Sequence, residues 1–171
     1  MTEIETAIAE NRKAIEEFIE AARAVPPERW QAPRAEGAWS PAQIAEHLAI
    51  TFEFNRKVVA GTAPPLPALI RPFVQPLLRR VVITKTLEAG RFTRKGRTPK
   101  FLKPSETPPA VDAVLARLNA AVAGLESDLR SRHPEARHTV SHPAFGRLVT
   151  HDWIRVQAIH VRHHLVQLTS T

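Results

Sequence analysis

The chain has 171 residues and a formal net charge of +7, and it contains 6 glycines but neither cysteine nor tyrosine. The lack of cysteine excludes disulfides and thiolate metal ligands. Few glycines, together with the absence of any long period-2 alternation of apolar residues, argue against a β-rich fold and favour helices. At this length we expect residues 1–171 to form a single domain with a full hydrophobic core.

The positive charge is concentrated in one segment. Residues 71–103 hold ten lysines or arginines and one acidic residue, whereas the rest of the chain holds 14 basic and 16 acidic residues. The first residues lack the cationic and apolar regions of a secretory signal. No apolar run approaches the ~20 residues that are needed to cross a bilayer. We therefore expect a cytoplasmic protein without a membrane partner.

The first expected helix covers residues 3–23. Thr2 and Glu5 have the spacing of a capping box at its start, and Pro26 and Pro27 prevent its continuation. Apolar residues recur along it with a period of about 3.6 residues, and glutamates fill the opposite side. This pattern predicts an amphipathic helix that buries one face against the rest of the domain.

The second expected helix begins at Ser40-Pro41 and runs to about residue 60, before Gly61. Ser40 suits the cap, Pro41 suits the first helical position, and Gln43 completes a second capping box. His47 lies on the mostly apolar face of this helix. Histidines in such positions more often make one structural hydrogen bond than bind a ligand, so this residue alone does not establish a site.

A long connection, residues 62–108, follows the second helix and is interrupted repeatedly by proline. The apolar residues from Leu69 to Val82 are expected to make short helices that cover one end of the bundle. The basic stretch after them contains Phe92 and Phe101. This stretch fits a lid over a pocket, a site for phosphates or a nucleic-acid backbone, or a solvated loop whose charges aid solubility.

Two more helices are expected in the last third of the chain. The third opens at Thr107-Pro108-Pro109 and ends near Arg132, with apolar residues at i, i+3 and i+4 spacing. The fourth covers residues 150–168, with Thr150 as a plausible cap. The turn-rich stretch between them contains three histidines that we expect at the surface: His133, His138 and His142.

The fourth helix carries a row of histidines beside its apolar face. At about 100° per residue, His160 and His164 lie ~40° apart on the same side and one turn removed from each other. Two imidazoles at this spacing can converge on one metal ion, although the bare spacing also occurs by chance. His163 is rotated ~100° from His164 toward the flank of the helix.

His47 of the second helix would complete a set of three nitrogen donors with His160 and His164. Three donors leave coordination positions open for water or substrate, which is the arrangement of a catalytic metal site and not of a closed structural one. Nitrogen ligands suit several divalent ions, among which we expect zinc or nickel first. The residues that we expect to orient these imidazoles or a water are Gln43, Thr51 and Gln157.

Two motifs resemble the DinB-like superfamily of helical-bundle metalloproteins, which includes the bacillithiol S-transferases. These are W-S-P-A-Q-I-A-E-H-L at Trp39–Leu48 and H-P-A-F-G-R-L-V-T-H-D-W…I-H-V-R-H-H-L-V-Q-L at His142–Leu168. The resemblance implies a divalent metal ion held by His47, His160 and His164. His163 leaves an alternative open, since i, i+3 spacing could replace i, i+4.

We therefore expect an all-α, up-down-down-up four-helix bundle in which residues 62–108 are a long, Pro-rich, basic insert between the second and third helices. The resemblance implies a thiol-dependent S-transferase that acts on small electrophiles. Because the chain has no cysteine, its low-molecular-weight thiol would come from solution as a cosubstrate. The metal would lower the pKa of that thiol.

Other functions fit the same expected fold. A metal-bound water would make the site a hydrolase, and a bundle without catalysis would be a ligand-binding or interaction module. The insert is a candidate surface for a homodimer. It is also a candidate for nucleic-acid contact, although we do not expect this function. Nucleic-acid binding would have an affinity that falls steeply as the salt concentration rises. Motifs for a Ser-His-Asp triad or a phosphate-cradling glycine loop are absent from the sequence.

Overall fold

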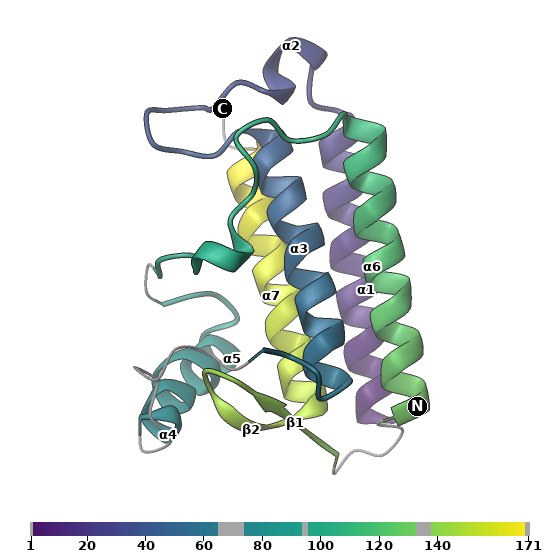
Figure 1. The fold of residues 1–171 in the computed structure, drawn as a ribbon, viewed down its shortest axis with the longest axis vertical. Helices are drawn as coiled ribbons and strands as arrows, with labels where there is room; N and C mark the ends of the chain where they lie inside the picture. The colour runs from purple at the N-terminus through teal and green to yellow at the C-terminus, as the bar shows by residue number, and fades with distance from the viewer. Residues whose placement is uncertain (1, 65–73, 94–95, 133–137, 170–171) are drawn as a thin grey trace.

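The computed structural model describes residues 2–64, 74–93, 96–132 and 138–169. Four long helices lie side by side along the longest axis of the molecule (Figure 1). Their bounds are α1 Glu3–Arg23, α3 Pro41–Val59, α6 Val111–Arg132 and α7 Thr150–Thr169. Helix α1 packs mainly against α7, and α3 packs mainly against α6. The mostly helical character that the sequence predicts is confirmed.

The remaining elements are short. They are α2 Pro27–Trp30, α4 Gln75–Leu78, the π-helical turn η1 Arg79–Thr84, α5 Lys85–Ala89, the 3-10 turn η2 Lys100–Leu102, and the strands β1 Thr139–His142 and β2 Gly146–Val149. Helices α4 to α5 form a continuous run that ends at Gly90, whose φ of 61° is left-handed and favours glycine. Short helices in the insert were expected, although residues 69, 70 and 73 lie outside the described part of the chain.

The predicted helix starts are confirmed in part. In α3 the Gln43 amide N–H donates to Ser40 Oγ at 3.2 Å, and the Ser40 N–H donates to Gln43 Oε1 at 3.1 Å, which completes the capping box. In α1 the Glu5 N–H donates to Thr2 Oγ1, but the Glu5 carboxylate pairs with Arg130. The box expected there is therefore only half formed, because a cross-helix cation competes for its carboxylate.

The β-hairpin corrects two expectations. Strands β1 and β2 pair antiparallel, with Val140 opposite Leu148, and Gly146 takes a φ of 71° where β2 begins. The fold is thus not purely helical. Alternation along β1 turns Val140 and His142 inward. His142 is buried against Phe145, and the expected surface position is wrong for this residue. His138 is half-buried, while residue 133 lies outside the described residues.

The core fills the space among the four long helices. Its largest fully buried side chains include Phe18 of α1, Phe52 of α3, Leu118 of α6 and Ile154 of α7, so every long helix contributes. Burial of each such side chain stabilises the fold by roughly 1.5–3 kcal/mol. None of the helices in the described part of the chain combines the length and the apolar character that a membrane span requires.

Candidate metal centre

The structure brings the three predicted histidines together. His47 lies two turns into α3 on its buried face, and His160 and His164 lie on successive turns of α7. The Nε2 atom of His160 is 3.3 Å from Nε2 of His47 and 3.0 Å from Nε2 of His164. The candidate ligand atoms all lie within 4.8 Å of one another. These three side chains are therefore close enough to hold one metal ion.

The hydrogen bonds behind the rings fix where two of their protons lie. The carbonyl oxygen of Leu102 is 2.8 Å from Nδ1 of His47. Because a carbonyl only accepts, Nδ1 must carry the hydrogen, and a neutral His47 ring then has a lone pair at Nε2. The Gln167 Oε1 atom likewise accepts a hydrogen bond from Nδ1 of His164, at 2.8 Å, which leaves a lone pair at Nε2 of that ring. Both rings therefore direct lone pairs toward His160.

His160 cannot satisfy both neighbours with protons. A neutral imidazole carries at most one hydrogen on Nε2, which can be donated to only one of the two lone pairs that face it. The remaining contact would place two lone pairs 3.0 or 3.3 Å apart. A cation between the three nitrogens removes this conflict. Tetrahedral zinc with Zn–N bonds of about 2.0–2.1 Å requires ligand nitrogens about 3.3 Å apart, which the two separations of 3.3 and 3.0 Å from His160 Nε2 approach.

The electrostatics keep the three imidazoles neutral near pH 7. Burial lowers the pKa of His47, although its bond to the Leu102 carbonyl opposes this shift. Burial, with repulsion from His47, lowers the pKa of His164 to about 3. Burial and the neighbouring histidines hold the pKa of His160 well below 6.5. Neutral imidazole is the form that binds a metal ion, so the site is ready for ligation without losing protons.

Two aromatic side chains from outside the long helices line the histidine cluster. The Trp39 ring, just before α3, is 4.8 Å from the His47 ring and 6.3 Å from the His164 ring, centroid to centroid. The Phe92 ring, just after α5, is 5.7 Å from the His160 ring. These rings place apolar surface beside the candidate ligands.

Comparison with known proteins places the chain in a family. Residues 13–171 match the family described as "Protein of unknown function (DUF1569)". The chain belongs to the DUF1569 family. A solved structure, the four-helix-bundle protein TT2238, shares 24% sequence identity with this DUF1569 protein, with a TM-score of 0.60 and 98% of each chain covered. A comparison with curated proteins gave no match. The family match and the solved structure are compatible with the DinB-like resemblance, although neither names that superfamily.

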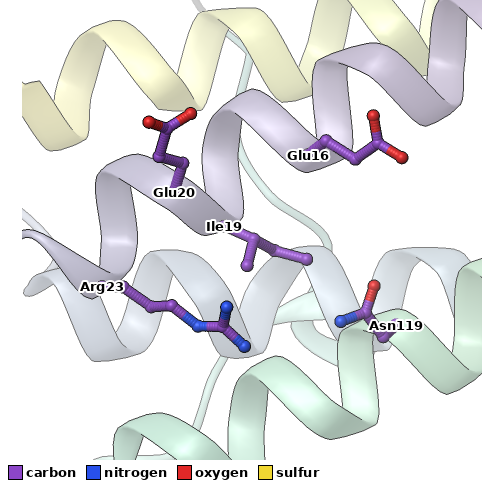
Figure 2. Close-up of a pocket in the computed structure, with 5 residues that line it drawn as sticks. All are labelled: Glu16, Ile19, Glu20, Arg23 and Asn119. Carbon is purple, nitrogen blue, oxygen red and sulfur yellow. The ribbon is translucent and has the colours of Figure 1, made fainter.

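Two surface hollows of this DUF1569 protein lie away from the three histidines. One of about 360 Å³ lies between α1 and α6 and is lined by Glu16, Ile19, Glu20, Arg23 and Asn119, as Figure 2 shows. Another of about 320 Å³ lies between the η1–α5 run and the start of α7 with strand β2. Neither includes His47, His160 or His164. The candidate centre is identified by its ligand chemistry.

The partners of the histidines differ from those expected. The Gln43 side chain bonds Ser40 and Ser105, Thr51 donates to the His47 backbone carbonyl, and Gln157 donates to the Trp153 carbonyl. None of these four bonds is to an imidazole ring. The groups that do orient imidazoles are the Leu102 carbonyl and the Gln167 side chain. Gln167 shares the histidine row of α7, whereas a backbone carbonyl has no signature in the sequence.

We predict that Gln167→Leu weakens zinc binding. The substitution removes the acceptor that fixes Nδ1–H of His164, and loss of such a partner typically costs about 10–100-fold in metal affinity. A competition titration with a chromophoric chelator measures the change. Gln157→Leu, on the same helix but bonded to the Trp153 carbonyl, is the matched control. Equal zinc affinity in Gln167→Leu and the control would show that this bond does not orient a ligand.

Proposed function

We propose that this DUF1569 protein binds one divalent metal ion through His47, His160 and His164 and uses it in thiol-dependent transfer to small electrophiles. The observation that carries the metal site is the convergence of three Nε2 atoms, two of them held as lone-pair donors. The reaction class comes from the resemblance of the two histidine motifs to the DinB-like superfamily. Zinc and nickel are the ions that we propose first.

The bound ion would supply Lewis acidity that lowers the pKa of a thiol and makes thiolate available near neutral pH. Three protein ligands leave room for such a guest. The chain itself supplies no thiol, since it has no cysteine. We therefore propose a low-molecular-weight thiol from solution as cosubstrate, and a small electrophile as the second substrate.

The chain's own side chains would select and place these molecules. Trp39 and Phe92 offer apolar ring surface beside the ligands, which suits an apolar electrophile and keeps water away from it. Arg91 and Lys103 are exposed next to Phe92 and the Leu102 carbonyl. Their positive charge would attract an acidic thiol that carries carboxylates.

The finer features of the architecture belong to the same proposal. We propose one domain over residues 1–171, with an up-down-down-up order and the insert 62–108 as its crossover. The view in Figure 1 supports this order, because α1 and α7 begin at the end marked N and α3 and α6 begin at the opposite end. A cytoplasmic location and a homodimer are further parts of the proposal.

We predict that protein loaded with zinc or nickel accelerates the loss of a small thiol in the presence of an electrophile. The assay compares glutathione, mycothiol and bacillithiol, each with the same alkyl or aryl halide. Chelator-stripped protein should lose the acceleration and regain it with one equivalent of metal, as elemental analysis would verify. Thiol loss no faster than with the free ion would remove the transferase proposal. Hydrolysis of an ester by the loaded protein would favour the hydrolase instead.

A further inference from the structure

The segment that orients His47 is itself held on α3. Three side chains on one side of the first turns of α3, at i, i+3 and i+4, make four hydrogen bonds to residues 102–105. The bonds run from His47 Nδ1 to the Leu102 carbonyl at 2.8 Å, from the Ser105 N–H and Oγ to Glu46 Oε2 at 2.8 and 2.7 Å, and from Gln43 Nε2 to the Ser105 carbonyl at 3.2 Å. The position of residues 102–105 against α3 therefore depends on these three side chains.

Glu46 is the unusual member of this group, because it is a carboxylate that is only 6% exposed. Removal of a charge from water is costly unless strong hydrogen bonds replace the lost hydration. Arg117 is only a distant partner at 3.6 Å, because its guanidinium is engaged bidentately with Glu53. The shortest hydrogen bonds of the Glu46 carboxylate are thus the two from Ser105.

The connection from Ser105 to Leu102 is short and stiff. Pro104 has a fixed φ, and the residue before a proline is restricted to extended backbone. Lys103 is extended as this requires, with φ −72° and ψ 140°. A displacement of Ser105 is therefore transmitted to the Leu102 carbonyl, which lies against His47.

We propose that Glu46 and Gln43 are positioning residues of the metal centre, which hold Ser105 so that the Leu102 carbonyl sets the tautomer and orientation of His47. The proposal rests on the proposed function, since it requires His47 to bind the metal ion. It also predicts the reverse effect. Because coupling between two binding events is reciprocal, a metal ion on His47 should tighten the docking of residues 102–105 onto α3.

The first test measures zinc affinity in Glu46→Leu and Ser105→Ala. Glu46→Leu removes the buried carboxylate and should raise the zinc dissociation constant about tenfold or more, in the range found when outer partners of metal ligands are lost. Ser105 is exposed, so water can satisfy the N–H and hydroxyl donors that lose Glu46, and Arg117 keeps its two bonds to Glu53. The thermal midpoint of the metal-free variant should therefore stay near that of the wild type, which separates positioning from folding.

Two further variants make this test specific. Ser105→Thr keeps the hydroxyl and should restore the affinity that Ser105→Ala loses. Glu53→Leu is the matched control, because it removes another α3 carboxylate with an arginine partner but no bond to residues 102–105. Its zinc affinity should change less than about threefold, well below the effect of losing an outer partner.

The second test uses trypsin, which can cleave after the exposed Lys100, whereas Pro104 protects the bond after Lys103. Zinc should slow cleavage after Lys100 about tenfold in the wild type and much less in Glu46→Leu, as the reciprocal coupling requires. Equal zinc affinity or equal protection in the wild type and Glu46→Leu would overturn this inference alone. A wild-type protein that binds no zinc would overturn the proposed function and this inference together.

Discussion

Replacement of His160 by alanine should abolish tight zinc binding. His160 is the central residue of the proposed ligand set, because its Nε2 atom faces Nε2 of both His47 and His164. Its loss would leave two nitrogens donated from different helices. We expect the affinity to fall by more than about 100-fold, since loss of an outer partner alone costs 10–100-fold. Competition titration of the chelator-stripped variant against a chromophoric chelator measures this directly.

His163→Ala is the control for the same experiment. His163 is exposed, and its Nε2 atom is hydrogen-bonded to the side-chain amide of Gln167. It is not one of the three histidines whose nitrogens converge. We expect an affinity change below about tenfold, at the low end of outer-partner effects. This outcome would rule out the alternative in which His163, at i+3 from His160, replaces His164 as the ligand. Full zinc occupancy in His160→Ala, or an equal loss in both variants, would contradict the ligand set.

Acidification should strongly destabilise the metal-free protein. Burial lowers the pKa of His142 to about 4, compared with 6.5 for an exposed histidine. Above pH 6.5 the ring is neutral in both the folded and unfolded states. As pH falls from 6.5 to 4, the unfolded state gains a proton that the folded state cannot, so stability falls by about 1.4 kcal/mol per pH unit, or about 3 kcal/mol. His164, with a pKa of about 3, adds to the loss.

These losses are large compared with the free energy of unfolding of a typical domain, which is about 5–15 kcal/mol. Urea unfolding of the stripped protein at pH 7, 6, 5 and 4 should therefore show a falling midpoint. His142→Asn is the informative variant, because its carbonyl oxygen can replace Nδ1 as acceptor for the Ala144 N–H. The variant should lose about 3 kcal/mol less between pH 7 and 4. The same loss in both proteins would rule out His142 as a source of acid sensitivity.

The long helices, and the placement of His160 and His164 on one side of α7, could be predicted because both depend on periodicity. The Ser40 capping box and the proline at the first position of α3 are local signals, and the structure forms them as expected. The i, i+4 spacing placed His160 and His164 on one side of α7. The convergence of these residues with His47 required the additional information of the two motifs and their family resemblance.

The missed features depend on interactions that local patterns do not encode. Strands of four residues are too short for a reliable period, so the hairpin and the burial of His142 were not foreseen. The Leu102 carbonyl is a backbone group whose position depends on how the insert docks. Glu46 was an ordinary helix residue in the sequence, and only its two bonds to Ser105 reveal its role.

X-ray absorption at the metal edge of the zinc-loaded wild-type protein tests the metal centre most directly. Our account predicts one ion per chain, with three imidazole nitrogens at about 2.0–2.1 Å and the remaining coordination from water or another small oxygen ligand. A spectrum with fewer than three imidazoles, or the absence of stoichiometric zinc binding, would contradict the assignment of His47, His160 and His164 as the ligands.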